Sequence, residues 1–136
     1  MTALAADRYN ATRRLGLDFV FPIKAGVKIY TGALVVIETA TGFAKPGVSA
    51  AGLICVGVAQ ETKDNTLGAN GALTVAVKHG TYPFSNPAAL TATSIGVPAY
   101  IVDDQSVNAI ATAQSLAGMI VDVNTEGLWV DTYRKA

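Results

Sequence analysis

The sequence predicts an all-β protein: a single-domain antiparallel β-sandwich or barrel, jelly-roll-like, with an irregular N-terminal arm. Short stretches of β-branched and aromatic residues are separated every few positions by Gly, Thr, Ala or Pro, which is the pattern of strands and tight turns. In addition, 51% of the 136 residues are hydrophobic and only 15% are charged, so the chain has enough apolar surface for one core.

The expected elements follow one another along the chain. Residues 1–16 show no sustained period of two or of 3.6 residues, so we expect an extended arm there and the β domain in residues 17–136. Strands are expected at residues 19–23, 27–30, 33–39, 52–61, 73–78, 98–102, 107–110, 118–123 and 128–133. The segment 52–61 is apolar on both faces, which predicts a central strand, and Pro22 confines its strand to an edge or an end.

Polar segments mark the connections between the strands. Residues 63–71 are rich in Asp, Asn and Gly, so we expect a loop that contains the turn dipeptide Asn70-Gly71. The strands on either side of this loop are expected to pair with each other. Residues 85–90 permit one helical turn, because a capping residue precedes Pro87, which stands at a favoured first helical position. No internal repeat and no second domain are visible in the sequence.

Residues that carry out chemistry are few. His79 is the sole histidine, which leaves no histidine cluster for a metal ion, and Cys55 is the sole cysteine and lies in an apolar alternation typical of a core residue. Trp129 lies between two apolar residues, so we expect it in the core, with an interface anchor as the alternative. The sequence predicts no catalytic, cofactor-binding or metal-binding residues, and no enzyme.

Two segments only partly match known binding loops. Residues 42–49 have the outline of a phosphate-binding loop, but Val48 stands where a lysine is required and no helical pattern follows. Residues 122–127 imitate the first half of a calcium loop, but Tyr133 stands where a bidentate glutamate is required. A hairpin turn is the favoured interpretation of residues 122–127, and a turn is also expected at Asp103-Asp104.

Charge is unevenly distributed, although the net charge is zero. Residues 1–28 hold five basic and two acidic residues, whereas five acidic and no Lys or Arg residues occur from Asp103 to Asp131. Ordinary solvated charge and contact with complementary surfaces on neighbouring molecules both account for this. The residues that we expect to contact a partner are Arg8, Tyr9, Arg13, Arg14, Lys24 and Lys28. Nucleic-acid binding is disfavoured, because the basic run is short and the overall balance is neutral.

The sequence also bears on the compartment. No segment approaches the roughly 18 uninterrupted apolar residues of a membrane helix, and charged residues near the N-terminus stand where a signal peptide would place its apolar centre. A single cysteine permits no intrachain disulfide, so oxidising export is not implied. We therefore expect synthesis in a cytoplasm and no contact with a membrane.

Eight short segments carry a more specific signal through their order and spacing. They are residues 22–35, 42–47, 56–61, 64–65, 71–72, 98–107, 117–123 and 127–130. Together they resemble a family of tailed-bacteriophage head proteins, the small decoration or cement proteins. The resemblance covers residues 22–130, most of the chain.

The resemblance implies a structural protein without catalytic residues or cofactors. It would bind the outer surface of an icosahedral phage head and stabilise the head by clamping neighbouring subunits of the major capsid protein. Its location would be the exterior of the virion, after synthesis in the cytoplasm of the bacterial host. We also expect copies of the chain to associate, as dimers in preference to trimers. The alternative is a non-catalytic β module that binds carbohydrate or a host surface.

Overall fold

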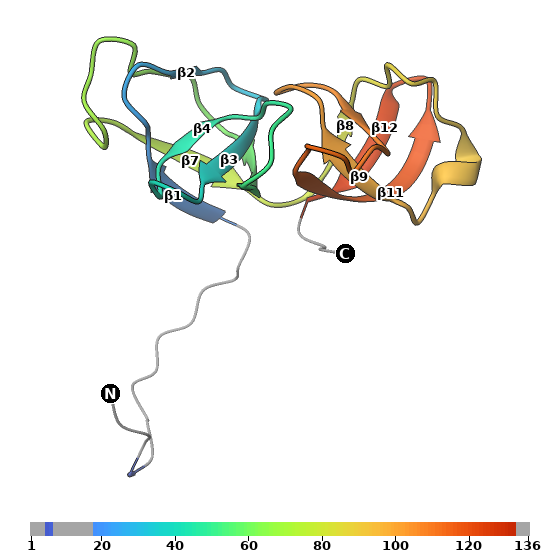
Figure 1. The fold of residues 1–136 in the computed structure, drawn as a ribbon, viewed down its shortest axis with the longest axis horizontal. Helices are drawn as coiled ribbons and strands as arrows, with labels where there is room; N and C mark the ends of the chain where they lie inside the picture. The colour runs from blue at the N-terminus through green and yellow to red at the C-terminus, as the bar shows by residue number, and fades with distance from the viewer. Residues whose placement is uncertain (1–4, 7–17, 133–136) are drawn as a thin grey trace.

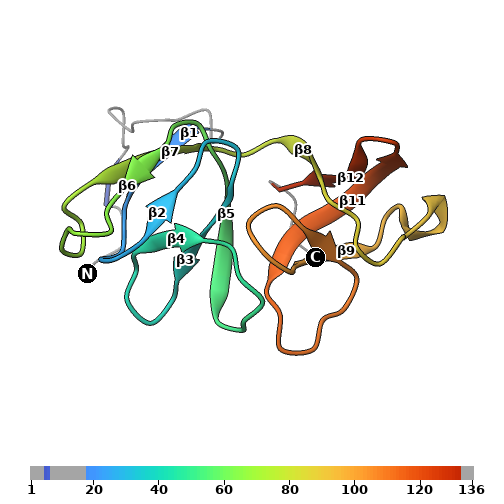
Figure 2. The ribbon, with the colours of Figure 1, turned by 90° about the horizontal axis from the view of Figure 1, so that it is seen from above.

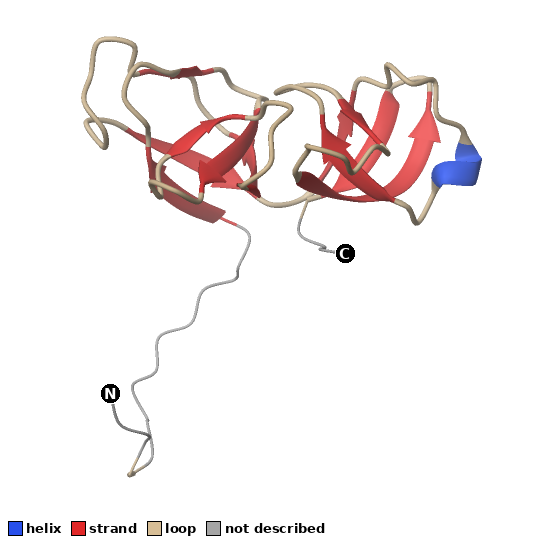
Figure 3. Ribbon diagram, in the orientation of Figure 1, coloured by secondary structure: helices blue, strands red, loops and turns tan. Residues whose placement is uncertain are grey.

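The computed structural model describes residues 5–6 and 18–132, and in this part of the chain nearly all regular structure is β (Figure 3). Two five-stranded antiparallel sheets pack together as a sandwich-like single domain (Figure 1). The predicted all-β fold is therefore confirmed. The predicted arm, residues 1–16, falls outside the described residues except for residues 5–6.

Each sheet is made from one contiguous part of the chain. The N-terminal sheet has the order β1 (Asp18–Pro22), β7 (Thr74–Lys78), β5 (Leu53–Ala59), β3 (Leu34–Glu38) and β4 (Ala44–Pro46). The C-terminal sheet has the order β10 (Val107–Asn108), β9 (Pro98–Ile101), β11 (Leu116–Asn124), β12 (Gly127–Asp131) and β8 (Thr81–Phe84). A small sheet of β2 (Lys28–Ile29) and β6 (Lys63–Asp64) lies beside the N-terminal sheet (Figure 2).

The strand connectivity was left open by the sequence. A jelly roll is built from two interleaved Greek keys, whereas here the chain completes one sheet before it begins the other. Each sheet curls until its first strand meets its third strand in a parallel bridge, Ile23 with Ala44 in the N-terminal sheet and Ser85 with Ser106 in the C-terminal sheet. Each sheet is therefore barrel-like, and the two lie side by side in Figure 1.

The positions of most predicted strands are confirmed, with ends that differ by one or a few residues. As expected, β1 is an edge strand that ends at Pro22, and β5 lies in the middle of its sheet and pairs with β7 across the polar loop. The sequence missed the short strands β4, β6 and β8, since two to four residues are too few to show a period.

The helical turn expected at residues 85–90 is wrong. The Asn86 side chain accepts a hydrogen bond from the Leu90 amide and donates one to the Leu90 carbonyl, which holds this segment as a closed turn. The only helical turn in the described residues comes slightly later, as a 3₁₀ turn at Ala92–Ser94.

The two sheets repeat the same topology, which corrects the expectation that the chain has no internal repeat. If the five strands of each sheet are numbered in chain order, leaving out the small β2–β6 sheet, both sheets have the order 1-5-4-2-3. The parallel bridge joins the first and third strands in both cases. Few residues are identical at corresponding positions, because either half needs only apolar residues of suitable size, so the sequence gives little sign of the repeat.

The repeat extends to details of the backbone. In the second and fourth strands the pairing slips by one residue at the same place, at Val56 in β5 and at Ala117 in β11. The glycine that follows each slip, Gly57 or Gly118, has no room for a Cβ atom beside the carbonyl oxygen of the last residue of the fifth strand. Equivalent glycines, Gly32 and Gly96, also lie just before the second strand of each sheet. The Gly32 amide donates to the Ala59 carbonyl oxygen, and the Gly96 amide donates to the Ile120 carbonyl oxygen.

Two hydrophobic clusters hold the structure together. One lies inside the curled N-terminal sheet and includes Ile23, Val35, Val56 and Val75. The other fills the C-terminal sheet and continues onto the outer face of β3 and β5 in the N-terminal sheet. The second cluster is therefore shared by both sheets, which makes them one domain.

Candidate partner-binding surface

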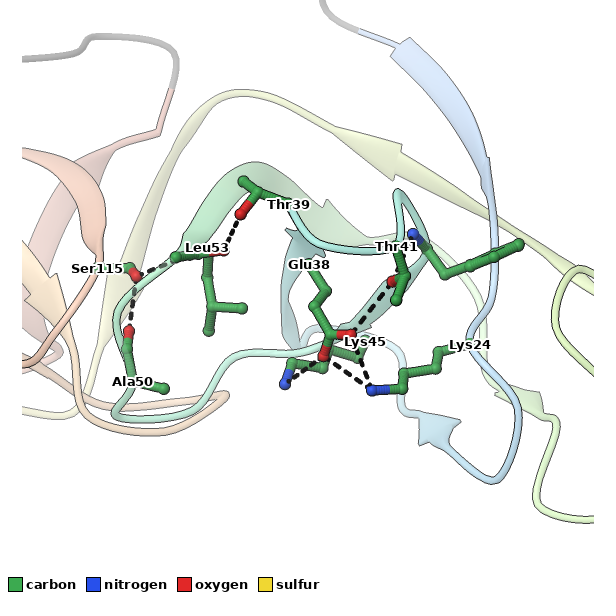
Figure 4. Close-up of polar contacts among 10 residues, drawn as sticks. Lys24, Glu38, Thr39, Thr41, Lys45, Ala50, Leu53 and Ser115 are labelled. Atoms are coloured by element: carbon green, nitrogen blue, oxygen red, sulfur yellow. Dashed lines mark hydrogen bonds and ion pairs between the residues drawn. The ribbon is translucent and has the colours of Figure 1, made fainter.

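The contact between the two sheets, here called the junction, is asymmetric. One end of the C-terminal sheet, at the β9–β10 hairpin and the start of β11, lies against the outer face of β3 and β5. The Leu34 amide donates to the Asp104 carbonyl oxygen over 2.8 Å. The Ser115 hydroxyl donates to Ala50 over 2.6 Å and accepts from the Leu53 amide over 3.1 Å (Figure 4). These bonds fix the two sheets relative to each other.

Three shallow grooves follow the edges of the junction. The first, about 390 Å³, lies between residues 30–33 and Asp104-Gln105. The second, about 370 Å³, is lined by residues 31–32, 58–60 and 82–84. The third, about 300 Å³, is apolar and is lined by Leu53, Ile54, Cys55 and Leu116. All are open to solvent and lack a charged cluster, so they offer surface for a partner rather than an enclosed pocket for a small molecule.

Lys24, one of the predicted partner-binding residues, takes part in an internal ion cluster. Its ammonium group lies 2.8 Å from a carboxylate oxygen of Glu38, and the Lys45 ammonium lies 3.1 Å from the same oxygen (Figure 4). The hydrogen bonds from Lys24 and then Lys45 lower the pKa of Glu38 from 4.5 to about 2. Lys24 therefore ties the segment after β1 to β3 and β4. No local pattern in the sequence points to Glu38 and Lys45 as its neighbours in this cluster.

Replacing Glu38 by Gln is expected to reduce stability in a pH-dependent way. A carboxylate whose pKa is lowered by folding stabilises the protein above its unfolded-state pKa, and this stabilisation is lost as the pH falls towards the folded-state value. The stability difference between the native chain and Glu38→Gln, measured by urea unfolding, should be largest near neutral pH and shrink between about pH 4.5 and 2.

A matched control is Glu61→Gln, because Glu61 pairs with Lys63 over a longer 3.6 Å and its side chain is 44% exposed. A pair of this kind contributes little to stability. If Glu38→Gln differed from the native chain by the same amount at every pH, the ion cluster would not be the cause.

Lys28, the other predicted partner-binding residue that the structure describes, lies over an aromatic ring. Its ammonium nitrogen is 4.8 Å from the centre of the Tyr30 ring, and the Tyr30 side chain is 57% exposed. Tyr30, the aromatic member of this cation–π pair, also lines the first junction groove. The remaining predicted residues, Arg8, Tyr9, Arg13 and Arg14, lie outside the described residues.

The edges of the sheets are poor templates for an added strand. β1, β4 and β8 are edge strands in the sheet orders, and each contains a proline, which donates no backbone hydrogen bond: Pro22, Pro46 and Pro83. The fourth edge strand, β10, has only two residues. A partner is therefore expected to contact side chains on this part of the molecule, rather than to extend a sheet.

The polar loops adopt the predicted turns. Residues 122–127 form the β11–β12 hairpin, in which the Asn124 carboxamide oxygen accepts hydrogen bonds from the Glu126 amide and the Trp129 indole. Asp103 accepts from the Gln105 amide in the turn between β9 and β10. Across residues 5–6 and 18–132, His, Cys, Asp and Glu nowhere gather in a group of three that could hold a metal ion.

The three single residues noted in the sequence have different surroundings. Cys55 is buried at the junction, as expected for a core residue. The His79 ring packs edge-on against Phe19, with 6.2 Å between the ring centres. Trp129 is half-buried on the outer side of β12, while its neighbours Leu128 and Val130 point into the core. The expectation that Trp129 lies in the core is therefore wrong, because it occupies the opposite phase of the strand alternation.

No family model, no curated protein and no solved structure matches the chain. Helices long and apolar enough to cross a membrane do not occur among the described residues.

Proposed function

We propose that this protein is a structural component of a phage virion, which binds the outer surface of the icosahedral head and clamps neighbouring subunits of the major capsid protein. The proposal starts from the segments that resemble head decoration proteins, which extend from Pro22 to Val130. We also propose that the protein is located on the exterior of the virion and is synthesised in the cytoplasm of the bacterial host.

One structural observation supports the proposal most directly: two differently charged parts of the chain belong to one domain with a shared core. Residues 18–79 contain five lysines and four acidic residues, whereas residues 80–132 contain five acidic residues and neither lysine nor arginine. The shared core and the Ser115 hydrogen bonds hold these two parts in a fixed relation. A body of this kind suits simultaneous contact with two different neighbouring surfaces.

In this mechanism, binding of the clamp is thermodynamically coupled to the closed state of the shell. A shell subunit that separates from its neighbour breaks the contacts of any clamp that touches both, so the binding free energy of the clamp favours the closed shell. A clamp that touches two subunits at once also gains from the high effective concentration of the second contact. Each copy can therefore bind weakly and still stabilise the shell, provided that the clamp itself is rigid.

The direct test uses the full chain and phage heads that lack it. The chain is expected to co-sediment with the heads to a saturating level and to raise the temperature at which the heads open and release DNA. Absence of saturable binding would contradict the proposal. Binding on a glycan array or to host cells, with no binding to heads, would favour a carbohydrate- or host-surface-binding module instead.

The basic residues predicted to contact the head provide a sharper version of this test. Replacing Arg8, Arg13 and Arg14 together by Gln in the full chain is expected to weaken head binding by about tenfold and to reduce its dependence on salt. The control replaces Lys63 and Lys78 by Gln, since both form only long ion pairs, of 3.6 and 3.9 Å. Equal loss of binding per charge removed in the two variants would mean that overall charge, rather than this segment, determines binding.

A further inference from the structure

The internal repeat makes it possible to compare each surface of one sheet with the corresponding surface of the other. Corresponding positions follow from the strand pairing: Val35 pairs with Gly57 just as Ala99 pairs with Gly118. The outer face of β3 and β5 is covered by the C-terminal sheet at the junction. The same comparison shows which surfaces have no such cover within the chain.

The first of these surfaces is the outer face of β9 and β11. In the N-terminal sheet, the face that the junction covers contains Leu34, Val36, Cys55 and Val58, all of which are buried. The residues at the corresponding positions of the C-terminal sheet are Pro98, Tyr100, Leu116 and Met119. These are equally apolar, but each remains partly exposed. We call this set the C-terminal face.

The second surface is the end of the N-terminal sheet that corresponds to the covered end of the C-terminal sheet. At the junction, Phe84 is 4% exposed, Ile101 is fully buried and Ser115 is 6% exposed. Their counterparts by strand pairing are Phe21, Ile37 and Ile54. Phe21 and Ile37 are only partly buried, and Ile54 is 51% exposed although it is a large apolar residue. We call this set the N-terminal open end.

The junction thus buries one face and one end. The matching end and the matching face are not buried, although Ile54 and Leu116, one from each, line the third junction groove. We infer that copies of this chain associate head to tail, with the N-terminal open end of one copy docked on the C-terminal face of the next. The contact between copies would repeat the contact that the junction already makes within one chain. This association does not depend on the proposed function.

Charge favours a second copy in this orientation. The C-terminal sheet carries five acidic residues and no lysine or arginine between residues 80 and 132, so contact between two C-terminal faces would bring like charges together. The N-terminal open end lies beside Lys24 and Lys45, which share one carboxylate, Glu38. Contact between unlike sheets therefore avoids this repulsion. A head-to-tail contact closes into a ring or continues as a chain of copies, according to the rotation between neighbours.

The experiment measures the mass of the full chain in solution by sedimentation velocity and light scattering, up to millimolar concentration. The native chain is expected to form species larger than a monomer as its concentration rises. Met119→Glu, on the C-terminal face, and Ile54→Glu, at the N-terminal open end, should each remain monomeric. The control is Leu67→Glu, because the Leu67 side chain is fully exposed in a loop, and this variant should associate as the native chain does.

Mixing the two monomeric variants distinguishes contact between unlike surfaces from contact between two like surfaces, and native species larger than a dimer distinguish a head-to-tail chain or ring from a two-fold dimer. Each variant keeps one intact half of the contact, so the mixture is expected to form a complex of two chains and nothing larger. Formation of this complex also shows that both variants are folded. A native chain that stays monomeric at all concentrations would overturn the inference. So would an Ile54→Glu chain that still associates, or a mixture that contains only monomers.

Discussion

Leu34→Ala is expected to lower the free energy of unfolding by about 3 kcal/mol. Leu34 is fully buried in the cluster that both sheets share, and its amide is hydrogen-bonded to Asp104 across the junction. Removing its side chain leaves a cavity that the surrounding β-structure can fill only in part. Urea unfolding at neutral pH measures the change.

Two native probes, one in each sheet, show whether Leu34→Ala destabilises both sheets together. Trp129 is the only tryptophan and lies in β12, and Cys55 is the only cysteine and lies buried in β5. Tryptophan fluorescence and thiol labelling should give coincident transitions in the native chain and in the variant, because one core supports both sheets. Separate transitions would contradict a shared core.

Leu67→Ala provides the matched control for Leu34→Ala. It removes the same atoms from a loop side chain that is fully exposed, so its effect should stay within about 0.5 kcal/mol. If both leucine variants were equally destabilised, burial at the junction would not explain the effect of Leu34→Ala.

Gly57→Ala and Gly118→Ala are each expected to cost about 3 kcal/mol or more. A Cβ atom on Gly57 would lie 2.5 Å from the Lys78 carbonyl oxygen, and one on Gly118 would clash with the Asp131 carbonyl oxygen. Gly57 also has a φ of +125°, which other residues rarely adopt. In both cases the clashing atom belongs to the backbone of a paired strand and cannot move aside. Thermal and urea unfolding measure the loss.

Gly42→Ala separates backbone conformation from crowding. Gly42 has a φ of +77°, but a Cβ atom there would have nothing within 4 Å. Its substitution should therefore cost only the conformational term, about 1 kcal/mol. Comparable losses at Gly42 and Gly118 would mean that the tight contact between the fourth and fifth strands does not matter.

The local pattern of apolar residues was sufficient to predict most strands, and an apolar run on both faces was sufficient to predict the central position of β5. The turn residues were sufficient to place the hairpin at Asn124 and the turn at Asp103, because these side chains satisfy their own backbone within two residues. Trp129 was placed wrongly, because Leu128, Trp129 and Val130 are all large and apolar. Such a run does not indicate which of the two alternating sets of side chains faces the core.

The partner-binding residues show the limit of sequence reasoning most clearly. Lys24 and Lys28 read alike in the sequence, as basic residues near an irregular segment. In the structure Lys24 is bound to Glu38, 14 residues further on, whereas Lys28 lies over the exposed Tyr30 ring. Charge is visible in a sequence, but the partner of a charge depends on which strands become neighbours.

The class of the fold, most of the strands, several turns and the uneven charge could be predicted from the sequence, since each depends on neighbouring residues or on composition. The three-dimensional structure was needed to see that the strands form the same five-stranded unit twice, and that one end of the C-terminal unit packs against the outer face of the N-terminal unit. These features arise from pairing between distant segments such as β1 and β7, and from burial at the junction. Many apolar sequences are compatible with the same strand pairing and the same buried junction, so the local sequence pattern predicts neither the pairing nor the junction.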